Sequence, residues 1–130
     1  MSRTSKAYED YLETILILEK TRGIVRSIDI AESKRVSRPS VNKAINNLIS
    51  LGYVIKENYG HVYLTDTGRE KATEIMNKHN LITNFLIEIL KVSPEISEND
   101  ACQMEHFLSN ETLEKLENFL IKYSLNKSNN

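Results

Sequence analysis

Two short helical segments joined by a tight turn are predicted between residues 27 and 52. Ser27 is expected to cap the first segment and Ser37 the second, because a serine hydroxyl accepts hydrogen bonds from the first backbone N–H groups of a helix. Pro39 suits the first turn of the second helix, which is expected to run from Pro39 to Leu51, and Gly52 suits the left-handed conformation that ends a helix. The residues of this helix expected to face inward are Val41, Ala44, Ile45, Leu48 and Ile49. The pattern predicts a helix-turn-helix.

An amphipathic helix is predicted before this motif and a β-hairpin after it. Residues 6–21 repeat apolar side chains at helical spacing. Two β-rich runs, 53–57 and 61–65, are separated by Asn58, Tyr59 and Gly60, and a glycine suits the positive φ of a short hairpin loop. Three helices followed by a hairpin predict a winged helix-turn-helix, with the hairpin as the wing.

The second half of the chain is predicted to be helical. A long helix is expected to begin at Thr67, with Thr65 as an alternative cap, and to run to about Leu90. Two shorter helices are expected over 97–108 and 110–124, and the polar tail 125–130 is expected to fray. The predicted fold is therefore mainly α, with a winged helix-turn-helix domain over residues 1–70 and an α-helical domain over residues 71–130.

Composition excludes several classes of protein. With 130 residues, 40% hydrophobic and 27% charged, the chain is not expected to be disordered, collagen-like or a large multidomain enzyme. Residues 1–65 carry 10 Lys and Arg against 7 Asp and Glu, a balance of +3, and residues 66–130 carry 7 against 11, a balance of −4. A single cysteine, Cys102, and the lack of a long apolar stretch predict a cytoplasmic protein that does not enter a membrane.

A basic first half with this predicted fold indicates double-stranded DNA as the partner. Polar side chains at the start of the second helix of a helix-turn-helix can enter the major groove, and a wing can cover the neighbouring backbone. The residues expected to contact DNA are Ser37, Arg38, Pro39, Ser40, Asn42, Lys43, Lys56 and Tyr59. Winged helices also serve as protein-docking modules, and a polar helix face is often only solvated. The charge balance favours DNA over these alternatives.

A homodimer is expected for two reasons. A domain with a balance of +3 binds DNA weakly by itself, whereas two copies can contact two half-sites. The second half also has more large apolar residues than two short helices need for their own packing. Those expected at the dimer surface are Phe85, Leu86, Ile89, Leu90, Phe107, Leu116 and Phe119.

Three residues with metal-ligating side chains share one face of a predicted helix. Cys102, Glu105 and His106 are spaced i, i+3 and i+4, which places their Cβ atoms about 5 to 6 Å apart. Further donors on other predicted helices are Asp10, Glu13 and His79. Each residue alone is more often a buried or solvated structural residue. Together they offer the sulfur, nitrogen and oxygen donors that divalent first-row metals favour.

Several segments match one family pattern: Tyr8–Glu13, Val36–Val41, Leu64–Gly68, His79 and Cys102–His106. Through them the chain resembles the diphtheria toxin repressor family, especially its short manganese transport regulator branch. The resemblance covers about residues 5–124. It implies a homodimeric, metal-activated repressor with an N-terminal winged helix and a C-terminal helical domain that binds metal and dimerises. The metal ligands that it implies are Asp10, Glu13, His79, Cys102, Glu105 and His106.

Two departures from the family pattern concern the metal. The manganese branch usually has a carboxylate where Cys102 stands, whereas the iron branch has the thiol but typically a methionine where Asp10 stands. Because a thiolate favours softer cations, Fe2+ is slightly favoured over Mn2+. A second site of the iron type would need a carboxylate at Thr83 and a histidine at Glu98, and this chain has neither.

The function predicted is a metal-activated, DNA-binding transcriptional repressor that controls metal-ion homeostasis, and not an enzyme. A metal-dependent hydrolase would need an open coordination position and a base in a cleft, and the sequence offers no spare catalytic arrangement beside the six candidate ligands. A metal-independent protein-docking module is the other alternative, and it predicts no DNA affinity at low salt.

Overall fold

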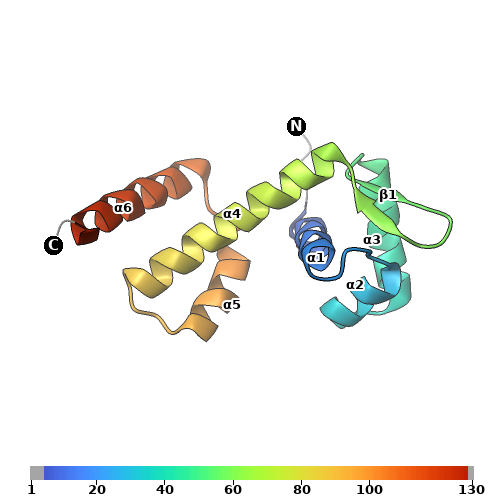
Figure 1. Cartoon of the computed structure of the whole chain (residues 1–130), viewed down its shortest axis with the longest axis horizontal. Helices are drawn as coiled ribbons and strands as arrows, with labels where there is room; N and C mark the ends of the chain where they lie inside the picture. Colours follow the sequence, from blue (N-terminus) through green and yellow to red (C-terminus); the bar gives the residue numbers. More distant parts are fainter. Residues whose placement is uncertain (1–4, 129–130) are drawn as a thin grey trace. The chain divides into compact units, whose positions relative to one another are not determined.

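The computed structural model describes residues 5–128, which form six helices and a two-stranded sheet. The elements in chain order are α1 (Lys6–Arg22), α2 (Ser27–Lys34), α3 (Arg38–Ser50), β1 (Val54–Lys56), β2 (Val62–Leu64), α4 (Asp66–Glu88), α5 (Pro94–Met104) and α6 (Asn110–Ser128) (Figure 1). Their contacts divide the chain into unit 1, Met1–Glu74, and unit 2, Ile75–Asn130, with the boundary inside α4. The mainly α fold with an N-terminal winged helix-turn-helix is confirmed.

Unit 1 has a core built from the inner faces of α1, α2 and α3 together with the sheet. Leu12, Ile15, Ile30 and Leu48 are fully buried there. Ser37 caps α3 as predicted, since its Oγ accepts the Ser40 N–H at 3.3 Å. The inward face of α3 is also as predicted except at one position. Ile49 is 39% exposed, because it lies at the edge of the apolar stripe near the end of the helix.

The cap of α2 is not Ser27, so that prediction is wrong. The cap position is Arg26, whose backbone N–H donates to Asp29 Oδ2 at 2.9 Å. Ser27 is the first residue of the helix and is buried. An acidic side chain three residues into the helix therefore takes the role that the sequence pattern gave to the serine hydroxyl.

The wing is a short antiparallel hairpin, in which Val54 pairs with Leu64 and Lys56 with Val62. The strands are shorter than the predicted runs, and Gly60 in the connecting loop has φ +82° as expected. Before the hairpin, Gly52 has φ +84°, and the Tyr53 N–H donates to the Leu48 carbonyl at 2.9 Å. This left-handed glycine ends α3 as predicted.

The start of α4 is fixed against the wing by Thr65 and Gly68. Thr65 Oγ1 accepts the Gly68 N–H at 3.0 Å and donates to the Gly52 carbonyl at 2.7 Å, so Thr65 and not Thr67 caps the helix. A Cβ atom on Gly68 would overlap the carbonyl oxygen of Tyr53. A glycine is therefore required where α4 passes the backbone of the hairpin.

Unit 2 contains most of α4 together with α5 and α6, packed around Ile82, Leu86, Ala101 and Leu113. The burial of Leu86, which is 7% exposed, shows that its predicted place on a free apolar surface is wrong. The remaining residues of that predicted surface are at least partly exposed.

The helix bounds in unit 2 differ from the prediction at four points. Helix α4 ends at Glu88, two residues early, and α5 begins at Pro94 because Ser93 caps it by accepting the Ile96 N–H at 3.4 Å. Helix α5 ends at Met104, four residues early, so Glu105 caps it and His106 lies in the turn that follows. Helix α6 continues to Ser128, so the predicted frayed tail is helical from 125 to 128, and residues 129–130 lie outside the described part. Within residues 5–128, no helix is both long and apolar enough to cross a bilayer.

Candidate functional site

Three side chains with metal-ligating atoms come together in unit 2. His79 lies on α4, Cys102 on α5, and Glu105 is the residue that ends α5. One ligand atom of each, the imidazole nitrogen, the thiol sulfur and a carboxylate oxygen, lies within 4.8 Å of the other two. Ligands around a first-row metal sit about 2.0 to 2.3 Å from the ion, so this spacing requires only small side-chain adjustments for all three to bind one ion.

His79 joins two carboxylates of unit 2. Its Nδ1 lies 3.0 Å from Glu105 Oε2 and its Nε2 lies 2.6 Å from Glu98 Oε1. The hydrogen bond to Glu105 is the largest cause that raises the pKa of His79 to about 9; Glu98 adds to it, and burial opposes it. His79 is therefore protonated at neutral pH, and both ring nitrogens donate. A proton therefore occupies the ring nitrogen to which a metal cation could otherwise bind.

The other carboxylate oxygen of Glu105 provides a test of whether a metal fits this cluster. Glu105 Oε1 is buried and accepts no hydrogen bond from any residue in the described part of the chain, although His106 Nε2 lies 3.3 Å away. A buried carboxylate oxygen without a donor is costly and needs an explanation. A cation bound by Glu105 would provide a positive charge for that oxygen, and the imidazole of His79 and the accessible thiol of Cys102 supply further donors, so the residues present fit a divalent metal ion.

Glu98 is a contact of the cluster that the sequence interpretation did not include among its ligands. It precedes Cys102 by four residues on α5 and Glu105, the residue that caps α5, by seven, so helical spacing was the signal that could have identified it. Its partner His79 lies on another helix, which spacing alone does not reveal. Thr83, by contrast, uses its hydroxyl to donate to the His79 carbonyl at 2.8 Å.

The predicted ligands Asp10 and Glu13 lie on α1 in unit 1, three residues apart. Asp10 Oδ2 accepts from Lys6 Nζ at 3.2 Å, and Glu13 is only 8% exposed. A buried carboxylate on an otherwise apolar face is unusual for a helix that serves only packing. The participation of Asp10, Glu13 and His106 in metal binding stays a prediction.

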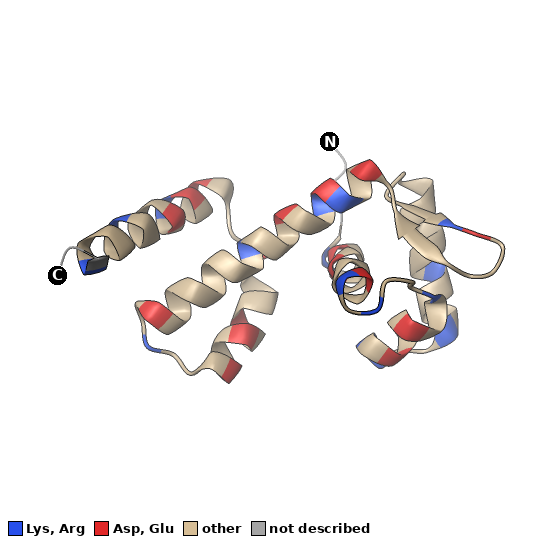
Figure 2. Ribbon diagram, viewed as in Figure 1, with Lys and Arg blue, Asp and Glu red and all other residues tan. Residues whose placement is uncertain are grey.

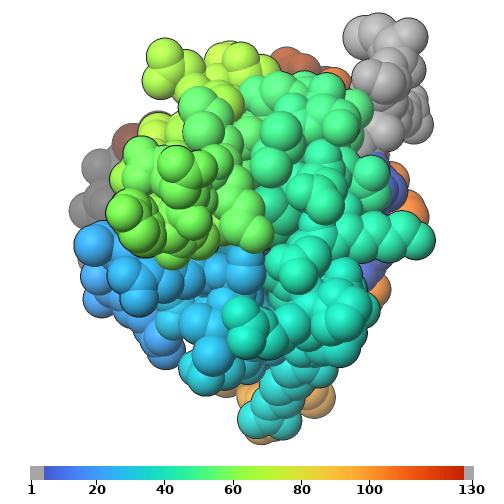
Figure 3. Space-filling model, turned by 90° about the vertical axis from the view of Figure 1, so that its right-hand side faces the viewer, coloured from blue at the N-terminus to red at the C-terminus, as the bar shows by residue number. Residues whose placement is uncertain are grey.

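The predicted DNA-contacting residues all lie at the surface of unit 1. They are Ser37, Arg38, Pro39, Ser40, Asn42, Lys43, Lys56 and Tyr59. The first six come from the start of α3 and its cap, and Lys56 and Tyr59 come from the wing. Figure 2 shows basic residues on α3 and on the wing, and Figure 3 shows α2, α3 and the wing meeting on one face. Their contact with DNA stays a prediction.

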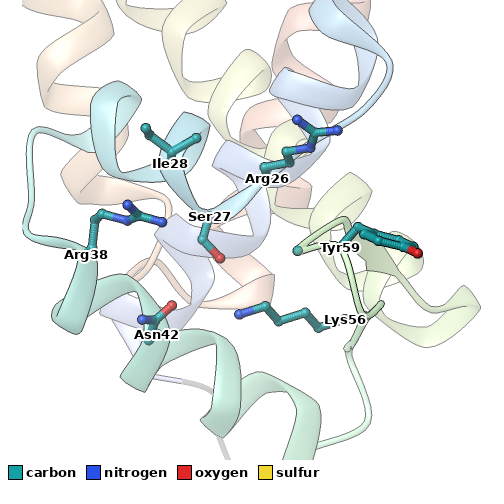
Figure 4. A pocket seen from close by; sticks show the side chains of 8 residues that line it. Arg26, Ser27, Ile28, Arg38, Asn42, Lys56 and Tyr59 are labelled. Atoms are coloured by element: carbon teal, nitrogen blue, oxygen red, sulfur yellow. The ribbon is translucent and has the colours of Figure 1, made fainter.

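A hollow of about 210 Å³ opens between α2, α3 and the wing. The side chains around it include three cations, and Figure 4 shows those of Arg38, Asn42 and Lys56 directed toward Ser27. The full set of residues that line it is Arg26, Ser27, Ile28, Arg38, Asn42, Lys56, Tyr59 and Gly60. Ser27 and Arg26 were not predicted from the sequence to lie on the DNA-contacting face, because the pattern assigned Ser27 to helix capping.

Two family models match almost the whole chain. The iron dependent repressor N-terminal DNA binding domain matches residues 3–62, and the iron dependent repressor metal binding and dimerisation domain matches residues 65–126. A curated relative of similar length, an uncharacterized HTH-type transcriptional regulator of Methanocaldococcus jannaschii, is 35% identical over 92% of this chain and 96% of its own length. The chain belongs to the iron-dependent repressor family. The resemblance to the diphtheria toxin repressor family is thereby confirmed.

Other members of this family show the same relationship. The transcriptional regulator MntR of Salmonella typhimurium is 41% identical over 82% of this chain and 67% of its own length. The solved structure of the manganese regulator SloR superposes with a TM-score of 0.77 and 30% identity over 92% of this chain. The chain spans 54% of the length of that solved protein.

An apolar groove of about 410 Å³ lies on unit 2 between α4 and α6. Phe85 of α4, Ile89 just after the end of α4, and Leu116 and Phe119 of α6 line it, with Phe119 50% exposed. All four belong to the surface predicted for the homodimer. Exposed aromatic and aliphatic side chains gathered in this way are typical of an interface between proteins.

Proposed function

We propose that the chain is a metal-activated, DNA-binding transcriptional repressor that controls metal-ion homeostasis. The observation that carries this proposal is the cluster of His79, Cys102 and Glu105, with its unsatisfied carboxylate oxygen, in a chain that also has an exposed polar helix-turn-helix face. Membership of the iron-dependent repressor family supports the same function.

The metal ligands in this proposal are Asp10, Glu13, His79, Cys102, Glu105 and His106. When bound, the metal cation would supply the positive charge that replaces the protons lost from His79 and Cys102. His79 must lose the proton that Glu105 and Glu98 now stabilise, and Cys102 must bind as the thiolate. The thiolate favours Fe2+ slightly over Mn2+, whereas the carboxylates keep Mn2+ a possible activator. Both a family of iron-dependent repressors and a solved manganese regulator support this pair of metals.

The proposed coupling follows from where the ligands lie in the chain. Asp10 and Glu13 belong to unit 1, which carries the DNA-contacting residues, and the other ligands belong to unit 2. Ligands drawn from both units restrict how α3 of each copy can be presented to DNA. A hundredfold gain in DNA affinity then requires a coupling free energy of about 2.7 kcal/mol.

We propose that the active form is a homodimer held by the apolar groove of unit 2. The groove buries aromatic side chains against a second copy, and two copies place two α3 helices at half-sites about one DNA turn, ~34 Å, apart. The start of α3 then enters the major groove, where Ser40 and Lys43 contact base edges, while Arg38 and Asn42 lie beside the backbone with Lys56 and Tyr59 of the wing.

Fluorescence anisotropy with an operator duplex, under anaerobic conditions, tests the proposal. Affinity is measured without metal and with Fe2+, Mn2+ or Mg2+, the last serving as a hard cation that thiolate and imidazole bind poorly. We expect an increase of about a hundredfold with Fe2+ or Mn2+ and little change with Mg2+. Equal affinities with and without Fe2+ and Mn2+ would exclude the switch, and no affinity at low salt would favour a protein-docking module.

A further inference from the structure

Ser27 has a buried hydroxyl that the fold does not use. The residue is 7% exposed, and its Oγ accepts or donates no hydrogen bond within residues 5–128. Capping does not explain the hydroxyl, because the Asp29 carboxylate takes the Arg26 N–H at the start of α2. Figure 4 shows this oxygen directed into the hollow, toward Asn42 and Lys56. A buried polar group of this kind indicates a hydrogen-bond partner that comes from outside the chain.

The charge around Ser27 indicates that the missing partner is an anion. Arg26, Arg38 and Lys56 line the hollow, and no carboxylate does. No ion pair joins any of these three cations to a residue that the structure describes. The positive end of α2 also faces this point, since Ser27 is the first residue of that helix.

We propose that the hollow binds one backbone phosphate of DNA. The Ser27 hydroxyl donates to a phosphate oxygen, Arg38 and Lys56 supply the charge, and the Asn42 amide supplies a further donor. This inference rests on the proposed function, because α3 and the wing border the hollow on the face that holds the predicted DNA-contacting residues. One phosphate fixed between α2 and the wing sets the register of α3 along the groove without reading a base.

The first test compares Ser27→Ala with a serine of unit 1 outside the hollow. Ser50, whose exposed hydroxyl donates to the Asn46 carbonyl, supplies the control Ser50→Ala. Anisotropy with a mixed-sequence duplex at low salt is expected to show about fivefold weaker binding for Ser27→Ala and no change for the control. Because the lost hydroxyl is buried and unsatisfied, the thermal midpoint of Ser27→Ala is expected to equal or exceed that of the wild type. Equal DNA affinities of Ser27→Ala and wild type would overturn the inference.

The second test uses charge. Lys56→Gln is compared with Lys20→Gln, which removes the same charge from an exposed position on α1. Loss of one phosphate contact is expected to lower the slope of log affinity against log salt by about one for Lys56→Gln, and not for Lys20→Gln. Ser27→Ala and Lys56→Gln together should weaken binding by less than the product of the single effects, because they share one phosphate. Identical slopes, or fully multiplicative effects, would overturn the inference.

Titration with inorganic phosphate separates a DNA phosphate from a free one. Amide shifts of Ser27 and Ile28, followed by NMR, are expected to saturate only at roughly millimolar phosphate, because a single contact without the rest of the DNA is weak. Saturation at micromolar phosphate would assign the hollow to a free anion and overturn the DNA assignment. A wild type that binds no duplex would refute the proposed function and this inference together. Duplex binding that no hollow variant alters would refute this inference alone.

Discussion

Unit 1 and unit 2 each contain a buried side-chain oxygen that lacks a hydrogen-bond partner within the described part of the chain. In unit 1 one such oxygen is Ser27 Oγ, and in unit 2 it is Glu105 Oε1. The surroundings of the two oxygens are opposite. Arginine and lysine side chains border the hollow at Ser27, whereas the thiol of Cys102 and the imidazole of His79 lie beside Glu105, and a second carboxylate, Glu98, contacts the other ring nitrogen of His79. The neighbouring charges, and not the unsatisfied oxygen itself, therefore determine whether each site suits an anion or a cation.

The two sites also differ in what balances them before a ligand arrives. The carboxylates of unit 2 already hold a proton on His79, whose pKa is raised to about 9. The cations at the hollow in unit 1 have no such internal partner among the described residues. Metal binding in unit 2 must therefore compete with protons, and DNA binding in unit 1 must compete with dissolved salt.

The largest expected effect comes from displacing the wing, which forms one wall of the hollow in unit 1. Gly68→Ala places a methyl group on the Tyr53 carbonyl oxygen, and the overlap is with backbone that cannot move aside. We expect a loss of about 3 kcal/mol in the free energy of unfolding. Gly52→Ala is the control, because it meets no atom within 4 Å and costs only about 1 to 2 kcal/mol for its positive φ. Urea unfolding followed by circular dichroism measures both, and equal losses would show that the close approach is unimportant.

The second effect concerns the unsatisfied oxygen of unit 2. Glu105→Gln keeps the shape of the side chain but removes its negative charge and places an amide beside His79. We expect metal affinity to fall by about a hundredfold, since a buried ligand is lost. Competition with a fluorescent chelator measures that affinity. Glu114→Gln, at an exposed position on α6 outside the apolar groove, is the matched control and should bind metal like the wild type. A Glu105→Gln variant with unchanged affinity would remove Glu105 from the metal site.

The third effect is the competition between metal and proton at His79. The pKa of His79, about 9, lies above its ordinary value of 6.5, so below pH 9 a metal must displace a proton from this imidazole. Loss of this one proton should therefore raise metal affinity about tenfold per pH unit up to about pH 9. Calorimetry in buffers of different ionisation enthalpy should show about one proton fewer released by His79→Asn than by the wild type. The same release from both proteins would show that His79 keeps its proton.

The raised pKa of His79 also predicts how the metal-free protein responds to pH. The stabilisation from the charged His79 is fully present below pH 6.5, the ordinary value for an unfolded chain, and is lost as pH rises through about 9. The free energy of unfolding of the metal-free protein should therefore fall over that range. His79→Asn should lack this dependence, which urea titrations at several pH values will establish.

The smallest effect is a change of preference between metals. Cys102→Glu replaces a soft donor with a hard one, so the ratio of Fe2+ to Mn2+ affinity should fall by about tenfold while both metals still bind. Anaerobic titrations that follow DNA binding measure the ratio. Cys102→Ser, which removes the thiol without adding a charge, distinguishes the gain of a carboxylate from the loss of sulfur. Unchanged selectivity in both variants would show that the thiol of Cys102 does not bind the metal.

Much of the fold could be predicted from local sequence. Ser37 and Gly52 fix the ends of α3 through contacts within a few residues, so their roles follow from chemistry that is visible in the chain. Residue type and the family resemblance also singled out His79, Cys102 and Glu105, whose ligand atoms do lie together, while their binding of a metal stays a prediction. Where a residue caps a helix through near neighbours, the local pattern was sufficient.

Features that depend on contacts between distant segments could not be predicted. The requirement for Gly68 arises because the backbone at Tyr53 occupies the place where a Cβ atom on residue 68 would lie, and the contact of Glu98 with His79 joins two helices. Ser27 satisfies every local rule for a cap, yet Asp29 takes that role and leaves the hydroxyl inside the hollow. Packing between elements, and not propensity, determines these roles.

The most direct measurement of coupling between the metal site and the DNA site is the affinity of the protein for Mn2+ with and without a saturating operator duplex. Thermodynamic linkage requires that DNA tighten metal binding by the same factor by which metal tightens DNA binding. We expect that factor to be about a hundredfold in both directions. A metal affinity that is identical with and without DNA would contradict a metal-activated repressor.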